Sequence, residues 1–133
     1  MSDMGKKVIE VPELADSRHW SYEQCIRIGD RIEVAGQTGV DESYNVVSKE
    51  FEPQTRQTFK NVGHALNAAG ASLADVTRMT VYLTDMRYAE KFATEIRPDV
   101  LGSDLPVSSL IGVDHLALPG LLIEIEVSAY SPQ

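Results

Sequence analysis

Two carboxylates stand two residues apart near the C-terminus, within Leu121–Tyr130. A β-strand alternates its side chains between two faces, so Glu124 and Glu126 share one face of this stretch. The opposite face is entirely apolar and carries Leu121, Ile123, Ile125, Val127 and Ala129. Glutamate is depleted in strands, so the pair needs a reason. It indicates either a solvent-exposed sheet face or a carboxylate that points into a cleft, where it can contact a ligand.

The other side chains with reactive potential form no second cluster in the sequence. Cys25 is the lone cysteine, which excludes an internal disulfide and fits a reducing compartment. The sequence places no base beside it, so we interpret it as a small packed hydrophobe rather than a nucleophile. One cysteine cannot build a cysteine-rich zinc site, and His19, His64 and His115 lack ligand spacing. We therefore predict no metal site.

Length and charge limit the class of protein. A chain of 133 residues suffices for a substantial core, so we expect a single domain over 1–133. The net charge of −8 opposes binding to nucleic acid or to an anionic membrane, because both need a positive patch. The N-terminal segment lacks the apolar run of a signal peptide, and no stretch is long enough to span a membrane. We expect a cytoplasmic protein with neither nucleic-acid nor membrane partners.

Apolar alternation predicts the strands that position these residues. The candidates are Lys7–Val11, Tyr22–Ile28, Arg31–Gly36, Val76–Thr84, Val107–Val113 and Leu121–Tyr130. The pair Gly29-Asp30 predicts a two-residue hairpin. Gly36 marks a bulge, a close approach of a ligand to the backbone, or a simple turn. In the fourth strand, one face is predicted to carry Val76, Arg78, Thr80, Tyr82 and Thr84.

Two amphipathic helices are predicted between the strands. The first has Pro53 in its first turn and ends at Gly70. Its apolar stripe is Phe59, Val62, Ala65, Leu66 and Ala69. The second helix begins at the N-cap candidate Asp85, and Pro98 should end or kink it near Ile96. Its stripe is Ala89, Phe92, Ala93 and Ile96.

The order of these elements predicts an α+β architecture, in which both helices pack on one face of a single sheet. The other face then carries Glu124, Glu126 and several threonine, tyrosine and arginine side chains. A sheet face of such mixed polarity cannot form a hydrophobic core, yet it is a large area to leave exposed to water. We therefore predict that the chain oligomerises through it.

Short motifs along nearly the whole chain match a known family in order. They are Tyr22-Glu23-Gln24, Ile28-Gly29-Asp30, Val34-Ala35-Gly36-Gln37, Gln54-Thr55-Arg56-Gln57, Leu66-Asn67-Ala68-Ala69-Gly70, Thr80-Val81-Tyr82-Leu83-Thr84-Asp85-Met86, Leu118-Pro119 and Ile123-Glu124-Ile125-Glu126. The chain resembles the reactive-intermediate deaminases, the Rid or YjgF-like family. The resemblance implies a chorismate-mutase-like fold and a homotrimer with a central β-barrel. It also implies clefts between subunits that hydrolyse enamines and imines without a cofactor.

Site residues are carried over from the resemblance by position. Glu124 matches the glutamate that orients water, and Tyr22 matches a cleft tyrosine. Ala35, Gly36 and Gln37 match the strand-end turn, with Ala35 in place of the family's serine. The asparagine that is usual in the second helix corresponds to Ala93.

The family's arginine, which binds the substrate carboxylate, has no counterpart. Its place is Ser108 when counted forward from Pro106, or Leu110 when counted back from Pro119. Arg18 and His115 are the candidate substitutes.

Three functions stay open on the sequence alone. The chain is a divergent hydrolase of an enamine, an imine or a related small metabolite, with Glu124 as its water-orienting residue. Alternatively it is a trimer that binds a small metabolite without catalysis, or one that serves protein interaction or stress protection only. For Glu126 the open choice is between contact with a ligand and bonds inside the oligomer.

Overall fold

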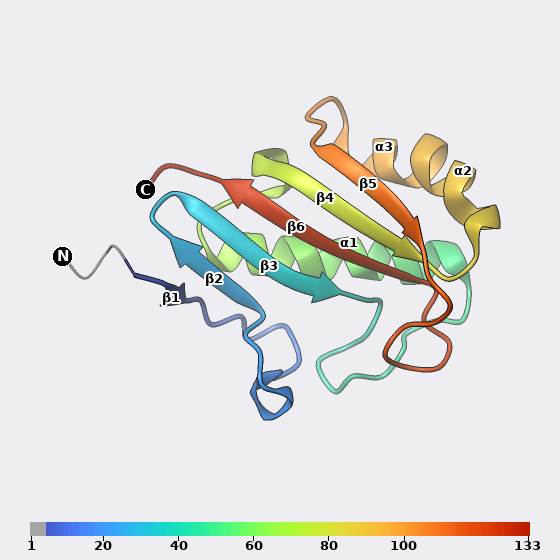
Figure 1. The fold of residues 1–133 in the computed structure, drawn as a ribbon, viewed down its shortest axis with the longest axis horizontal. Coiled ribbons are helices and arrows are strands. Elements are labelled where there is room, and N and C mark those ends of the chain that lie inside the picture. The colour runs from blue at the N-terminus through green and yellow to red at the C-terminus, as the bar shows by residue number, and fades with distance from the viewer. Residues whose placement is uncertain (1–4) are drawn as a thin grey trace.

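The computed structural model describes residues 5–133, which contain one six-stranded mixed sheet with its helices on one side (Figure 1). The strand order is β1-β2-β3-β6-β4-β5; β4 and β5 are parallel, and every other neighbouring pair is antiparallel. The strands are β1 (Lys7–Val8), β2 (Cys25–Ile28), β3 (Arg31–Gln37), β4 (Val76–Leu83), β5 (Val107–Gly112) and β6 (Ile123–Tyr130). The predicted α+β class and single mixed sheet are confirmed.

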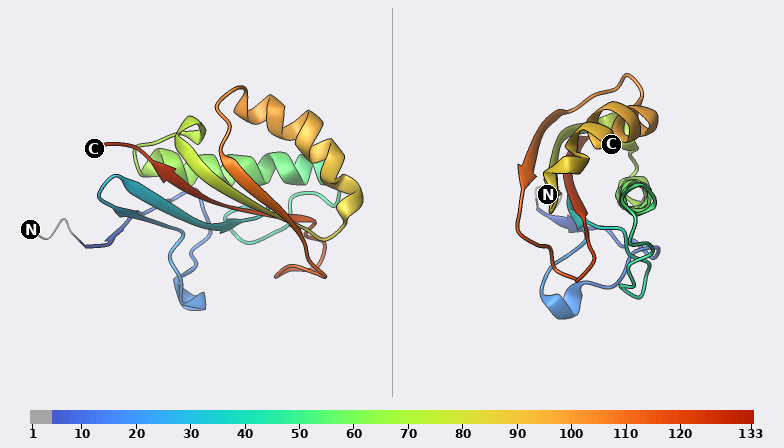
Figure 2. Two further views of the ribbon diagram at one scale, coloured as in Figure 1. Left: turned by 45° about the horizontal axis from the view of Figure 1, so that its top comes forward. Right: turned by 90° about the vertical axis from the view of Figure 1, so that its right-hand side faces the viewer.

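The long helix α1 (Phe51–Ala68) follows the predicted pattern. Its apolar stripe, Phe59, Val62, Ala65, Leu66 and Ala69, is buried against the sheet. Gly70 adopts a φ of +87° just after the helix, a left-handed conformation that favours glycine and ends the helix. Figure 2 shows α1 lying along the same side of the sheet as the second helical run.

The second helical run is irregular near Ile96, where an end or a kink is predicted, and it then continues to Leu101. Asp85 caps a 3₁₀ turn by accepting a hydrogen bond from the Arg87 N–H. Beyond α2 (Ala89–Lys91), a π-helical segment (Phe92–Ile96) leads into α3 (Arg97–Leu101). Pro98 falls in the first turn of α3, where its missing N–H needs no partner.

The helical stripe is also shorter than predicted. Phe92 and Ile96 are fully buried, and the Phe92 ring stacks on Phe59 at a centroid distance of 6.0 Å. Ala93 is exposed, so the predicted stripe is wrong at this position. A π turn contains more residues than an α turn, which changes the face that each following side chain occupies.

Strand β4 departs from simple alternation at its first residues. Val76 is buried, whereas Thr77 and Arg78 are both exposed. The pairing with β6 shifts register between Val76 and Arg78, which marks a β-bulge. The bulge moves Val76 to the helix side, so its predicted grouping with Arg78 is wrong. From Met79 onward the predicted alternation holds.

Strand β6 lies in the middle of the sheet between β3 and β4. Its predicted apolar face is buried throughout, while Glu126 and Tyr130 are exposed on the other side. The predicted β2–β3 hairpin is present, and Gly29 adopts a φ of +59° in its turn. No helix within residues 5–133 is long and apolar enough to cross a membrane.

The remaining short helices are single 3₁₀ turns at the ends of loops. They are η2 (Arg18–Trp20), η3 (Leu73–Asp75) and η4 (Met86–Tyr88).

Candidate functional site

The carboxylate of Glu124 lies against the backbone of Gly36. A Cβ added to Gly36 would stand 2.8 Å from Cδ and 3.1 Å from Cγ of Glu124, so only glycine fits without moving the glutamate. The β3–β6 pairing shifts register between Val34 and Gln37, which places Ala35 and Gly36 in a bulge. The bulge therefore gives Glu124 its space beside β3.

The two carboxylates of β6 have different surroundings. Glu126 accepts a hydrogen bond from the Tyr82 hydroxyl at 2.5 Å. The half-buried carboxylate of Glu124 makes no hydrogen bond or ion pair to any residue in 5–133. Burial, and after it the negative charge of Glu126, raise the pKa of Glu124. Of the two, Glu124 is thus the carboxylate that no neighbouring side chain within residues 5–133 occupies.

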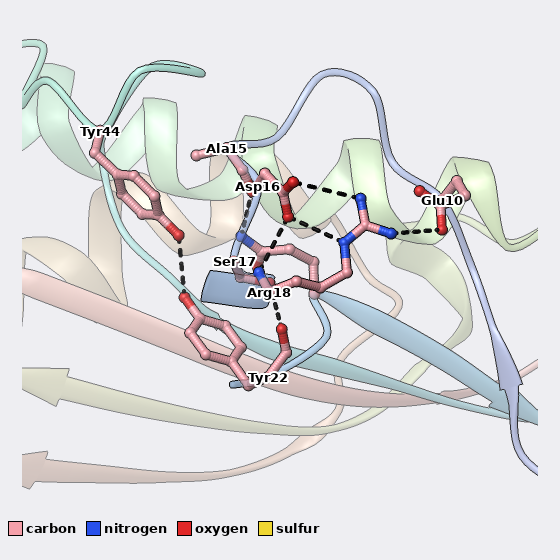
Figure 3. A network of polar contacts seen from close by, with 8 residues as sticks. Glu10, Ala15, Asp16, Ser17, Arg18, Tyr22 and Tyr44 are labelled. Atoms are coloured by element: carbon pink, nitrogen blue, oxygen red, sulfur yellow. Dashed lines mark hydrogen bonds and ion pairs between the residues drawn. The ribbon is translucent and has the colours of Figure 1, made fainter. Parts of the chain in front are cut away.

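The hydroxyl of Tyr22 lies 3.4 Å from the hydroxyl of Tyr44 (Figure 3). The backbone carbonyl of Tyr22 accepts a hydrogen bond from Ser17 Oγ at 2.6 Å, which fixes the turn that carries it. Burial, then the contact with Tyr44 and the charge of Glu124, raise the pKa of Tyr22. Its phenol therefore remains a proton donor at neutral pH.

Tyr44 is a member of this group that the sequence did not reveal. Its φ of +64° is unusual for a bulky side chain and marks local strain. The Asp41 carboxylate holds the turn by accepting from the N–H groups of Ser43 and Asn45, both at 2.9 Å. The Asp-Glu-Ser-Tyr-Asn stretch does signal a turn. Nothing in it shows that Tyr44 reaches a residue 22 positions earlier.

A small cavity of about 40 Å³ adjoins both tyrosines. Gly36, Gln37 and Asn61 also line it. The Gln37 amide donates to Gln24 Oε1 at 2.8 Å and to the Ala35 carbonyl at 3.0 Å, so it holds the bulge in place. The cavity has room for about one water molecule.

Two buried amides on α1 fix the loops around the cavity. Gln54 donates to the carbonyls of Ser48 and Gly120 and accepts from the Leu122 N–H at 2.6 Å. Asn61 donates to the carbonyls of Thr38 and Val40, both at 2.9 Å. These bonds connect the helix to the segments that follow β3 and precede β6.

Ser108 and Leu110 do not join this group within one chain. They pair with Met79 and Val81 of β4, whose side chains are buried on the helix side. Glu124 pairs with Tyr82, which lies on the opposite face. Strand β4 also stands between β5 and β6, so both residues are separated from Glu124 by position and by face.

The two candidate substitutes for the missing arginine are occupied by acids. Arg18 contacts Asp16 at 3.1 Å and Glu10 at 3.3 Å (Figure 3). His115 has an 84% exposed side chain whose Nδ1 lies 3.0 Å from Asp114. In the described part of the chain, no group of three or more His, Cys, Asp or Glu residues could hold a metal ion.

Comparison with known proteins gives consistent matches over almost the whole chain. A family model described as Endoribonuclease L-PSP matches residues 15–131. A RutC family protein of Pyrococcus abyssi is 36% identical over 128 residues, covering 96% of this chain and 98% of that protein. Reactive Intermediate Deaminase A of Arabidopsis thaliana, a chloroplast protein, is 32% identical over 125 residues, covering 93% of this chain and 66% of that protein.

A solved structure supports the same assignment. The crystal structure of a protein of unknown function from the Rid family of Yersinia pestis superposes with a TM-score of 0.87 and 27% identity. The match covers 95% of this chain and 99% of that one. Sequence and fold together show that the chain belongs to the Rid (YjgF-like) family.

Proposed function

We propose that this chain hydrolyses an enamine, an imine or a related small metabolite, with Glu124 orienting the attacking water. The reaction would take place in clefts between the subunits of a homotrimer. The observation that carries this proposal is the half-buried Glu124 carboxylate, which has no partner within residues 5–133 and a raised pKa. The Tyr22 hydroxyl, whose pKa is raised in part by the charge of Glu124, would supply a proton donor.

The chemistry needs one group that accepts and returns a proton. Glu124 takes a proton from water as the water oxygen attacks the carbon of the protonated imine, which forms a C–O bond and a neutral carbinolamine. Glu124 returns this proton to the nitrogen. The C–N bond then breaks while the carbinolamine hydroxyl gives its proton to Glu124, and the products are a carbonyl compound and ammonia. A carboxylate with a raised pKa suits this role because it binds the proton more readily at neutral pH. An enamine enters the same route after protonation at carbon.

A relative's name also supports the proposal. The Arabidopsis protein, which is 32% identical to this chain, is called Reactive Intermediate Deaminase A. Deamination of a reactive imine is the reaction derived above for Glu124. The trimer is proposed from the family resemblance, and the large sheet face of mixed polarity that carries Glu126 and Tyr130 is the surface through which we expect assembly.

The test is ammonia release from a panel of neutral and acidic imines generated in solution. We expect release above the buffer rate for at least one imine, and a loss of about 10² or more in Glu124→Gln, the size of a general-base contribution. Glu126→Gln is the matched control, because it makes the same change one pleat away on a carboxylate that is bonded to Tyr82. The absence of release across the panel, or full activity in Glu124→Gln, would refute the proposal.

The alternative is a trimer that binds a small metabolite or a protein partner without catalysis. It is favoured by the contacts of Arg18 and His115 with acids, because neither side chain is then available to hold a substrate carboxylate. It predicts a rise in melting temperature with a metabolite and no ammonia release. Light scattering tests the assembly: we expect three times the 14.7 kDa chain mass, and a monomer at micromolar concentration would contradict it.

A further inference from the structure

Arg97 has surroundings unlike those of the other arginines. Its guanidinium carbon stands 4.8 Å from the ring centroid of Phe92, so an aromatic ring covers one face of the cation. One terminal nitrogen donates to Ser108 Oγ at 2.8 Å and lies 4.0 Å from the sulfur of Met79. Burial lowers the pKa of Arg97, because the charge has lost part of its water shell.

No acid neutralises this cation within residues 5–133. The nearby acids on the same helical run are bonded elsewhere: Asp99 to Arg56 at 2.8 Å, and Glu95 to Lys91 at 3.6 Å. The other arginines have different surroundings. Four of them have carboxylate partners: Arg18, Arg31, Arg56 and Arg87. Buried Arg27 donates to the backbone carbonyls of Gly29, Ala69 and Ser131, and Arg78 is exposed to water. A partly desolvated charge without a counter-ion is unfavourable, so this position favours an anion from outside the chain.

The backbone presents Arg97 at an open edge of the sheet. The residue follows the π-helical segment Phe92–Ile96 and precedes Pro98, and π turns are frequent at functional sites. The neighbouring strand β5 is the sheet's outermost strand, where Ser108 is exposed and Val107 retains 59% of its accessible surface. An anion can therefore approach the guanidinium from solvent.

We propose that Arg97 and Ser108 form a binding subsite for the carboxylate of a small acidic metabolite. A planar guanidinium binds a carboxylate through two parallel hydrogen bonds. Phe92 limits the rotation of the guanidinium, and Ser108 Oγ fixes one of its nitrogens, which leaves other N–H groups for the ligand. Carboxylate binding stands on these contacts alone; the further step, that this metabolite is the substrate, rests on the proposed hydrolysis.

The subsite also bears on where the reaction occurs. Ser108 pairs with Met79, and Glu124 pairs with Tyr82 three residues further along β4. Three residues along a strand span about 10 Å, and the two steps from β5 across β4 to β6 span about 10 Å more in the perpendicular direction. The two side chains also lie on opposite faces of the sheet. One small molecule does not span this separation. A substrate that contacts both Arg97 and Glu124 must lie between two copies of the chain.

The test is calorimetric binding of pyruvate, a small 2-oxo acid, and of pyruvamide, its uncharged amide. We expect the wild-type protein to bind pyruvate in preference to the amide. Arg97→Gln should weaken pyruvate binding at least about tenfold, the effect of losing charged hydrogen bonds. Arg97→Lys keeps the charge but lacks the planar guanidinium, so its affinity for pyruvate should lie between those of the wild type and Arg97→Gln. Arg87→Gln makes the same charge change on a 90% exposed side chain and should bind like wild type.

Each contrary outcome shows which of the two proposals, the subsite or the hydrolysis, is wrong. Equal binding of acid and amide, or unchanged affinity in Arg97→Gln, overturns the subsite. So does a change in oligomer mass without a change in affinity, because the anion at Arg97 is then a carboxylate of a second copy. Pyruvate binding that depends on Arg97, in a protein that releases no ammonia from any imine, refutes the hydrolysis and leaves the subsite standing.

Discussion

Replacing Gly36 by alanine should move the candidate catalytic carboxylate of Glu124 and leave the free energy of unfolding nearly unchanged. The new Cβ would overlap Oε2 of Glu124, its nearest neighbour, and would lie 2.8 Å from Cδ, about 0.7 Å closer than carbon atoms prefer. The glutamate side chain is flexible and half-exposed, so it can swing toward water at a cost of roughly 0.5–1.5 kcal/mol in rotamer strain. Alanine also restricts the unfolded chain, which offsets about 0.4–1 kcal/mol.

The free energy of unfolding of Gly36→Ala should therefore stay within about 1 kcal/mol of wild type. The displaced carboxylate should nevertheless lose function, because a misplacement of about 1 Å can reduce rate by about 10². Chemical denaturation gives the stability. The pKa of Glu124, followed by NMR titration, gives the position without any substrate. It should fall toward the ordinary glutamate value as the carboxylate moves into water.

Two other glycines provide matched controls. Gly63 lies in α1 with nothing within 4 Å of an added Cβ, so Gly63→Ala should stabilise by about 0.5–1 kcal/mol. A Cβ on Gly39 would stand 2.5 Å from the backbone oxygen of Gln54, which cannot swing away, so Gly39→Ala should be the least stable. The reasoning fails if Gly36→Ala is as unstable as Gly39→Ala, or if its Glu124 titrates as in wild type.

Further predictions concern strain, charge, anchoring and reactivity. Tyr44→Asn should raise the free energy of unfolding by about 0.5–1 kcal/mol in denaturant titrations, since asparagine tolerates the φ of +64°; a loss would show that the contact with Tyr22 outweighs the strain. Glu124→Gln should be more stable than wild type at pH 7. The pKa of Glu124 is raised in the folded state, so the wild-type carboxyl group favours folding only when it is protonated. The difference in stability should therefore vanish below the unfolded pKa of about 4.3. Melting curves of both proteins at pH 3 and pH 7 check this sign, and an equal difference at both would contradict it. Gln54→Ala leaves two carbonyls and one N–H without their partner and should cost about 3 kcal/mol or more in denaturant titrations, whereas exposed Asn67→Ala should cost little. Burial raises the pKa of Cys25 to about 11, so alkylation by iodoacetamide at pH 8 should be far slower in the native protein than in denaturant, and similar rates would show that the thiol is accessible.

Much of the fold follows from local periodicity. The apolar face of Leu121–Tyr130 and the stripe from Phe59 to Ala69 are buried as predicted, because alternation and the helical repeat are properties of neighbouring residues. The exceptions are Val76, which a bulge moves to the other face, and Ala93, which the π-helical segment leaves exposed. Both depend on one extra residue in a strand or a turn, which periodicity does not register.

The candidate site divides in the same way. The sequence by itself determined that two glutamates share one face of a strand and that a glycine ends a neighbouring strand. Only the tertiary structure decided that Glu126 bonds to Tyr82 while Glu124 has no partner within residues 5–133, that Tyr44 contacts Tyr22, and that Arg97 contacts Ser108. The physical reason is that hydrogen bonding and burial depend on partners 11 to 44 positions away in the chain, and folding alone brings these side chains together.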